Sequence, residues 1–114
     1  MIVAEFGIID DIELYEEHTY EPEKYRCVSI DDDLYIDDWW ESLILMKTYF
    51  HNLSRPAYGL ARWGITLIPP ESLPIFQDIV ISDKRMEKDK NLVALAENIQ
   101  EAIAKQKYMI HYGV

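Results

Sequence analysis

Apolar and polar positions along the chain predict four β-strands. Residues 2–9 are apolar except at two positions and are rich in β-branched types, a pattern typical of a buried strand. Shorter β-prone runs at residues 25–30, 60–68 and 108–112 predict three more strands. Residues 10–24 are rich in acids and show little periodicity, so we expect an irregular loop there.

The first helix is predicted at residues 31–54. Three consecutive aspartates at its start offer an N-cap and negative charge in the first turn, where unpaired backbone N–H groups favour anions. Pro56 then stops the helix, because proline cannot continue the hydrogen-bond ladder and restricts the residue before it. The apolar residues at spacings of three and four are Ile36, Trp39, Leu43, Met46 and Phe50.

Two more helices follow the proline pair at residues 69–70. A serine and a proline near the first helical position predict a short helix that runs to about Val80. Residues 92–103 repeat apolar side chains at helical spacing without proline or glycine, which predicts a further helix. Lys105 and Lys107 place positive charge at its C-terminal end, where the helix dipole favours cations.

The order of these elements is strand, strand, helix, strand, helix, helix, strand. This order predicts an α+β fold, a small sheet of about four strands with helices packed on one face. We expect residues 1–114 to form one domain, because the chain is long enough for one core and its hydrophobic content of 49% exceeds that of disordered chains.

Negative charge is concentrated in the first part of the chain. Residues 1–41 hold 14 acidic side chains against Lys24 and Arg26, whereas the remainder holds 7 acidic and 9 basic ones. The pattern has two interpretations: a solvated face that maintains solubility, or a patch that steers a basic protein partner. Aromatic residues among the acids favour the second interpretation, because rings beside charges are typical of protein interfaces.

The candidate partner contacts come from two stretches of the acidic part. Trp39 and Trp40 are about 100° apart on a helix, so either both belong to a wide core or one of them anchors a partner. The predicted contacts are Asp31, Asp32, Asp33, Tyr35, Asp37, Asp38, Trp40 and Glu41, with Glu16, Glu17 and Tyr20 as a second group.

The same carboxylates suggest a site for a hard cation such as calcium, but the spacing argues against it. Tyr35 breaks the alternation of acids that a calcium loop requires, and Ile36 stands where the turn needs glycine. Capping of the predicted helix explains the acids without a metal. We therefore expect neither a metal nor another cofactor.

Catalytic signatures are also missing from the sequence. The three histidines are scattered, the glycines form no phosphate-binding or dinucleotide motif, and Cys27 lacks the local signature of a thiol nucleophile. We expect Cys27 to be a small buried residue within a strand. The chain is therefore predicted not to be an enzyme, unless the fold brings Cys27 and a histidine together.

Charge and hydropathy limit the partners and the location. A pI near 4.6 disfavours direct nucleic-acid binding, which depends on cations that neutralise phosphates. No apolar run approaches the ~20 residues that span a bilayer, and the start lacks the pattern of an export signal. With a single cysteine and no export signal, we expect a cytoplasmic protein that is not bound to a membrane.

Residues 91–113, NLVALAENIQEAIAKQKYMIHYG, form a helix-to-strand unit that resembles the end of the barstar family. Together with the small size and the acidic, aromatic first half, this unit is similar to small bacterial immunity proteins that protect cells from toxins. The Tyr-Gly-x-Asn segment and the Asp-Ala-Leu-Trp-Asp helix of barstars are absent, so no functional residue is carried over. The segments GITLIPPESL and MIHYG also resemble short uncharacterised bacterial proteins, which imply no activity.

These observations lead to one main hypothesis and one rival. The main hypothesis is an acidic protein-binding module, an immunity-type inhibitor that covers a basic toxin or nuclease. The rival is a structural or regulatory subunit that self-associates as a homodimer through exposed aromatic residues, with the acids serving only solubility.

Overall fold

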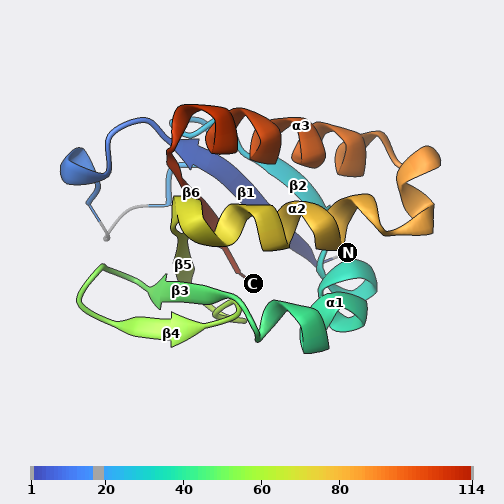
Figure 1. The fold of residues 1–114 in the computed structure, drawn as a ribbon, viewed down its shortest axis with the longest axis horizontal. Helices are drawn as coiled ribbons and strands as arrows, with labels where there is room; N and C mark the ends of the chain where they lie inside the picture. The colour runs from blue at the N-terminus through green and yellow to red at the C-terminus, as the bar shows by residue number, and fades with distance from the viewer. Residues whose placement is uncertain (1, 17–19, 114) are drawn as a thin grey trace.

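The structure is a computed structural model that describes residues 2–16 and 20–113 (Figure 1). Within these residues, six antiparallel strands form one sheet in the order β2-β1-β6-β5-β3-β4. The strands are β1 (Val3–Ile9), β2 (Val28–Asp31), β3 (Lys47–Phe50), β4 (Pro56–Tyr58), β5 (Ile65–Ile68) and β6 (Tyr108–Tyr112). The sheet is therefore larger than the predicted one of about four strands, although the α+β class is confirmed.

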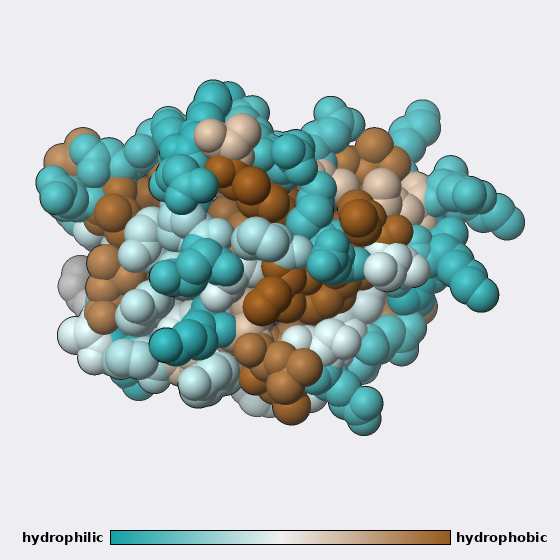
Figure 2. Space-filling view, viewed as in Figure 1, coloured by the Kyte–Doolittle hydropathy of each residue, from teal (hydrophilic) through white to brown (hydrophobic). Residues whose placement is uncertain are grey.

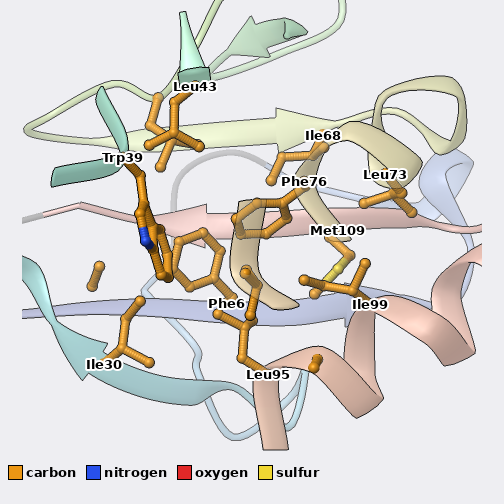
Figure 3. Close-up of a cluster of buried hydrophobic side chains, with 14 of the residues drawn as sticks. Phe6, Ile30, Trp39, Leu43, Ile68, Leu73, Phe76, Leu95, Ile99 and Met109 are labelled. Atoms are coloured by element: carbon orange, nitrogen blue, oxygen red, sulfur yellow. The ribbon is translucent and has the colours of Figure 1, made fainter. Parts of the chain in front are cut away.

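Helices cover one face of this sheet. They are α1 (Asp37–Leu43), α2 (Leu73–Ile81) and α3 (Lys90–Lys105). Figure 1 shows α2 and α3 running next to each other across the sheet, with α1 below the C-terminal part of α2. The main core fills the space between helices and sheet, where the rings of Phe6 and Phe76 lie 5.1 Å apart (Figure 3).

The opposite face of the sheet is covered by the acidic loop instead of a helix. Side chains of the loop, including Tyr15 and Tyr25, pack over Ile9 and Ile110 in a second apolar cluster. The loop approaches β1 closely at Gly7, where a β-carbon would lie 2.7 Å from the Sγ atom of Cys27. Glycine is needed here because any side chain would push the loop away from the sheet.

The predicted helix over residues 31–54 is wrong in its second half. The helix ends at Leu43, and the chain turns at Met46 before continuing as β3. Met46 and Phe50 fit the helical spacing. In the structure, however, Met46 is buried in the turn before β3, and within the strand Thr48 is buried while Lys47 is exposed. Pairing with β4 and β5 thus outweighs the local preference for a helix.

The predicted strand boundaries also need correction. Residues 25–27 lie outside β2, because Arg26 has a positive φ of 53° that an extended strand does not contain. Cys27 is consequently half-buried in the loop, so the prediction that it lies buried within a strand is wrong. The strand predicted at residues 60–68 is confined to Ile65–Ile68, since residues 60–64 form the connection from β4.

The later elements agree with the sequence pattern. The helices expected near residues 73–80 and 92–103 and the strand at 108–112 are confirmed as α2, α3 and β6. In α3 the Asp89 side chain accepts a hydrogen bond from the Asn91 amide, and Gln106 ends the helix in the left-handed conformation with φ of 56°. Ile99 is fully buried, as expected for the apolar side of this helix.

Candidate functional site

The candidate site begins where β2 ends. The Asp31 carboxylate accepts a hydrogen bond of 3.0 Å from the Leu34 amide and caps a π-helical turn, Asp32–Ile36, which leads directly into α1. The predicted N-cap is thus confirmed. The turn directs Asp32 and Tyr35 into the protein and leaves Asp33 and Leu34 exposed.

One arginine from the β4–β5 connection joins several candidate residues. Arg62 contacts the buried Asp32 carboxylate at 3.2 Å and forms an ion pair with the exposed Asp37. Its guanidinium also lies over the ring of Trp40, 5.3 Å from the ring centre, a cation–π contact. We call Arg62, Asp32, Asp37 and Trp40 the Arg62 cluster.

A second arginine, which follows α2, makes a matching set of contacts. Arg85 binds the buried Asp83 carboxylate through its Nε and Nη2 atoms at 2.9 and 2.7 Å. Its Nη2 atom also lies 3.0 Å from the exposed Asp38, and its guanidinium lies 4.5 Å from the ring centre of Tyr35. We call Arg85, Asp83, Asp38 and Tyr35 the Arg85 cluster.

The two clusters attach the start of α1 to distant parts of the chain. Asp37 and Asp38 are consecutive, yet each meets an arginine from a different segment. Trp39 strengthens the attachment, because its indole N–H donates a 2.9 Å hydrogen bond to Asp83. The acid-rich segment is therefore in large part a structural element. Local sequence patterns do not predict this role, because the two arginines lie far away along the chain.

The buried acids differ in their electrostatics. Burial raises the pKa of Asp32, because desolvation outweighs the attraction of Arg62. Hydrogen bonds from Arg85 hold the pKa of Asp83 far below its ordinary value. The Tyr35 hydroxyl donates a hydrogen bond to Asp89, and burial together with this bond raises the pKa of Tyr35 to about 12.

The predicted contacts consequently divide into structural and accessible residues. Asp32 and Tyr35 are buried and paired inside the chain, and Trp40 is half-buried below Arg62, so their contacts stabilise the fold. The members of the first group of predicted contacts that remain exposed are Asp33, Asp37, Asp38 and Glu41. Among the described residues, Asp33 and Glu41 have no ion-pair partner.

Exposed apolar side chains lie among these acids. Leu34, Ile44 and Leu45 are all substantially exposed, with Leu45 at 72%. Asp38 and Glu41 are three residues apart on α1 and therefore share one side of the helix, with Leu34 in the turn before α1 and Leu45 in the turn after it. Figure 2 shows hydrophobic residues at the surface near the turn from α1 to β3. We call the exposed side of this segment, Asp33, Leu34, Asp38, Glu41, Ile44 and Leu45, the α1 surface.

A shallow cleft of about 400 Å³ adjoins the α1 surface between α1 and the end of α2. Its lining includes Asp38, Asp78 and Asp83, together with Arg85, which already binds Asp38 and Asp83. Asp78 is exposed and without an ion pair among the described residues. Asp78 is therefore the carboxylate of the cleft that can accept a positively charged side chain.

Tyr20, from the second group of predicted contacts, lies on the other side of the sheet. Glu16 is exposed, and Glu17 lies outside the described residues. Tyr20 is exposed but has internal contacts: its hydroxyl donates to Glu5, and its ring packs edge-on against Tyr112 at 4.9 Å. Tyr20 therefore helps to hold the acidic loop over the sheet.

Cys27 and His111 are on opposite faces of the sheet. His111 is buried in the core, 4.9 Å from the Phe6 ring, while Cys27 belongs to the second apolar cluster. Burial raises the pKa of the Cys27 thiol to about 12, which leaves little thiolate at neutral pH. These two residues do not combine into a catalytic site.

No protein-family model, curated protein or solved structure matches this chain. Within residues 2–16 and 20–113, histidine, cysteine and acidic side chains form no group that could hold a metal ion. In the same part of the chain, no helix has both the length and the apolar composition required to cross a bilayer. The assignment of a function therefore depends on the geometry of the surface.

Proposed function

We propose that this chain is a protein-binding module that presents the α1 surface to a basic protein. The observation that carries the proposal is the combination of exposed apolar side chains with Asp33 and Glu41, two exposed acids without an ion pair in the described structure. Apolar anchors with charged residues around them are typical of interfaces that exclude water at their centre.

The Arg62 and Arg85 clusters support the proposal by making the surface rigid. Because the consecutive residues Asp37 and Asp38 at the start of α1 are tied to two other segments, little side-chain and backbone freedom would be lost when a partner binds. Carboxylates steer a basic partner during its approach, and the apolar residues slow its dissociation. The cleft beside Asp38 and Asp78 would receive a lysine or arginine of the partner.

An immunity-type inhibitor is the specific form of this function that we favour. Such a protein covers the basic surface with which a toxin or nuclease binds nucleic acid, so carboxylates take the place of phosphates. The net charge of −10 suits this role. We place the complex in the cytoplasm, where a protein with one unpaired cysteine remains reduced.

Affinity capture from the native cell with matched baits tests this proposal. The wild-type bait should retain a basic protein, and a Glu41→Gln/Leu45→Ala bait should lose it. A control bait, Glu97→Gln/Ile75→Ala, removes the same kinds of groups from exposed positions of α3 and α2 and should retain the protein. Equal capture by the two variant baits would contradict the assignment of the α1 surface.

A homodimer is the second candidate function. It is favoured by an open edge of the sheet at β2, whose end adjoins the α1 surface at Asp33.

A further inference from the structure

The outer edge of β2 carries unused hydrogen-bonding groups. The Asp32 amide donates to the Ile2 carbonyl at 2.8 Å, and Ala4 pairs with Ile30 in the same register. Alternate residues of an antiparallel strand direct their backbone groups to opposite edges. Ser29 and Asp31 therefore direct N–H and C=O groups away from β1, and within the described residues these groups have no backbone partner.

The opposite edge of the sheet, formed by β4, is protected. The Gly59 amide donates to the Met46 carbonyl at 2.9 Å, so Pro56 and Tyr58 direct their backbone groups outwards. Pro56 has no N–H group, and the strand is only three residues long. Proline on a short edge strand prevents pairing with another chain. β2 is also short, with four residues, but it contains no proline.

The two ends of β2 differ in charge. Arg26 precedes the strand with a side chain that is 71% exposed and lies 3.8 Å from Glu101 of α3, while Lys24 pairs with Glu21. Asp31 and the exposed Asp33 lie at its other end. When two copies of such a strand pair antiparallel, the basic end of each copy meets the acidic end of the other. The edge is thus self-complementary in charge as well as in hydrogen bonding.

We infer that the edge of β2 is a homodimer interface in which two copies pair antiparallel about a two-fold axis at Ser29. One sheet then continues through both copies, and Val28 faces Ile30 of the second copy on the side that α3 covers. Val28 is half-buried at the margin of the core, and this pairing covers its exposed part. An axis at Ile30 would instead place the apolar Val28 opposite the Asp32 carboxylate, so we place the axis at Ser29.

Mass measurements with paired proline variants test the interface. The wild-type protein should change from 13.5 kDa to twice that mass as its concentration rises, in light scattering or sedimentation. Ser29→Pro should remain monomeric with an unchanged circular dichroism spectrum, because the Ser29 amide makes no bond within one copy. Tyr58→Pro is the matched control on the other edge, and it should still dimerise.

Charge exchange gives a second test that does not need a proline variant to fold. Arg26→Glu should weaken the dimer at least tenfold, and adding Asp33→Lys to Arg26→Glu should restore much of the affinity, because both end contacts are then reversed. Amides of Ser29 and Asp31 should exchange hydrogen more slowly in the dimer than in the monomer.

Three results would overturn the inference. They are a wild-type protein that stays at 13.5 kDa up to millimolar concentration, a folded Ser29→Pro variant that dimerises normally, and an Arg26→Glu variant with unchanged dimer affinity. The dimer interface and the α1 surface share Asp33, but Ser29→Pro changes no residue of the α1 surface and so tests the dimer separately. If Ser29→Pro abolishes the dimer and the variant still captures a basic protein, the homodimer interface and the α1 surface act separately.

Discussion

The Arg62 and Arg85 clusters contain the same four kinds of group but hold their buried acids differently. Each has an arginine, a buried aspartate, an exposed aspartate of α1 and an aromatic ring. Asp83 receives bonds from the Arg85 amide, the Arg85 guanidinium and the Trp39 indole, and its pKa falls. Asp32 contacts the Arg62 guanidinium at 3.2 Å, and its pKa rises.

The difference shows that an arginine nearby does not by itself make a buried carboxylate favourable. Desolvation penalises the charged form in both clusters, and the number and geometry of the hydrogen bonds decide whether that cost is recovered. Asp83 therefore stabilises the fold in its charged form, whereas charged Asp32 has a net cost. This comparison predicts effects of different size when either buried aspartate is replaced by asparagine.

The largest effect is expected when either arginine is removed. Arg85→Ala leaves Asp83 buried and charged without its guanidinium, and Arg62→Ala does the same to Asp32. We expect each to lower the free energy of unfolding by about 3 kcal/mol, near the low end for a broken buried pair because both arginines are partly exposed. Lys107→Ala, which frees only the exposed Asp10, should cost less than about 1 kcal/mol in the same urea titration.

Asp83→Asn and Asp32→Asn should separate the two clusters. Asn cannot accept all the bonds that Asp83 accepts, so the variant should lose about 2 kcal/mol of unfolding free energy. Asp32→Asn removes a charge whose burial is costly, so the change should be smaller than about 1 kcal/mol in either direction. Equal losses in urea titrations of both variants would show that the clusters do not differ.

The pH dependence of stability should distinguish them further. Because the pKa of folded Asp83 lies below 3.8, its stabilisation is complete above that pH and is lost as the pH falls below it. The deficit of Asp83→Asn relative to wild type should therefore shrink in strong acid. Burial lowers the pKa of His111 to about 3, so both proteins should also lose stability as the pH falls from 6.5 to about 3. Chemical unfolding at pH 7, 4 and 3 would measure both effects.

The smallest effects are expected at the exposed acids of the two clusters. Asp37 and Asp38 are 56% and 63% exposed, so Asp37→Asn and Asp38→Asn should each cost less than about 1 kcal/mol. High salt should reduce even this difference, because it screens exposed charges. A loss above about 2 kcal/mol in thermal or urea unfolding would mean that these pairs are as important as the buried ones.

Local patterns were sufficient for some elements and not for others. In α3, apolar spacing, the Asp89 cap and the absence of proline agree, so the sequence predicted the helix. At Met46 and Phe50 the same spacing fits a helix as well as a turn and strand, and only pairing with β4 and β5 decides between them. A three-residue strand such as β4 leaves too short a pattern to be recognised.

The candidate site shows the same limit. The N-cap at Asp31 depends on residues three positions apart and could be predicted. The roles of Asp32 and Tyr35 depend on Arg62 and Arg85, which the sequence separates from them by about 30 and 50 residues. Residues 83–90 mix acidic and basic side chains, yet Asp83 and Arg85 there are partly buried and bind α1. The density of charge therefore indicated where the candidate site lies, but it did not predict the role of each acidic residue.

Association kinetics with the captured partner test the central claim most directly. Asp33→Asn/Glu41→Gln removes two exposed charges from the α1 surface without touching either arginine, and Glu87→Gln/Glu97→Gln removes two exposed charges elsewhere. Stopped-flow measurements at several salt concentrations should show slower association and a weaker salt dependence for the first variant, with little change in dissociation and wild-type behaviour for the second. Identical association rates and salt slopes for both variants would contradict the claim that the α1 surface steers a basic protein.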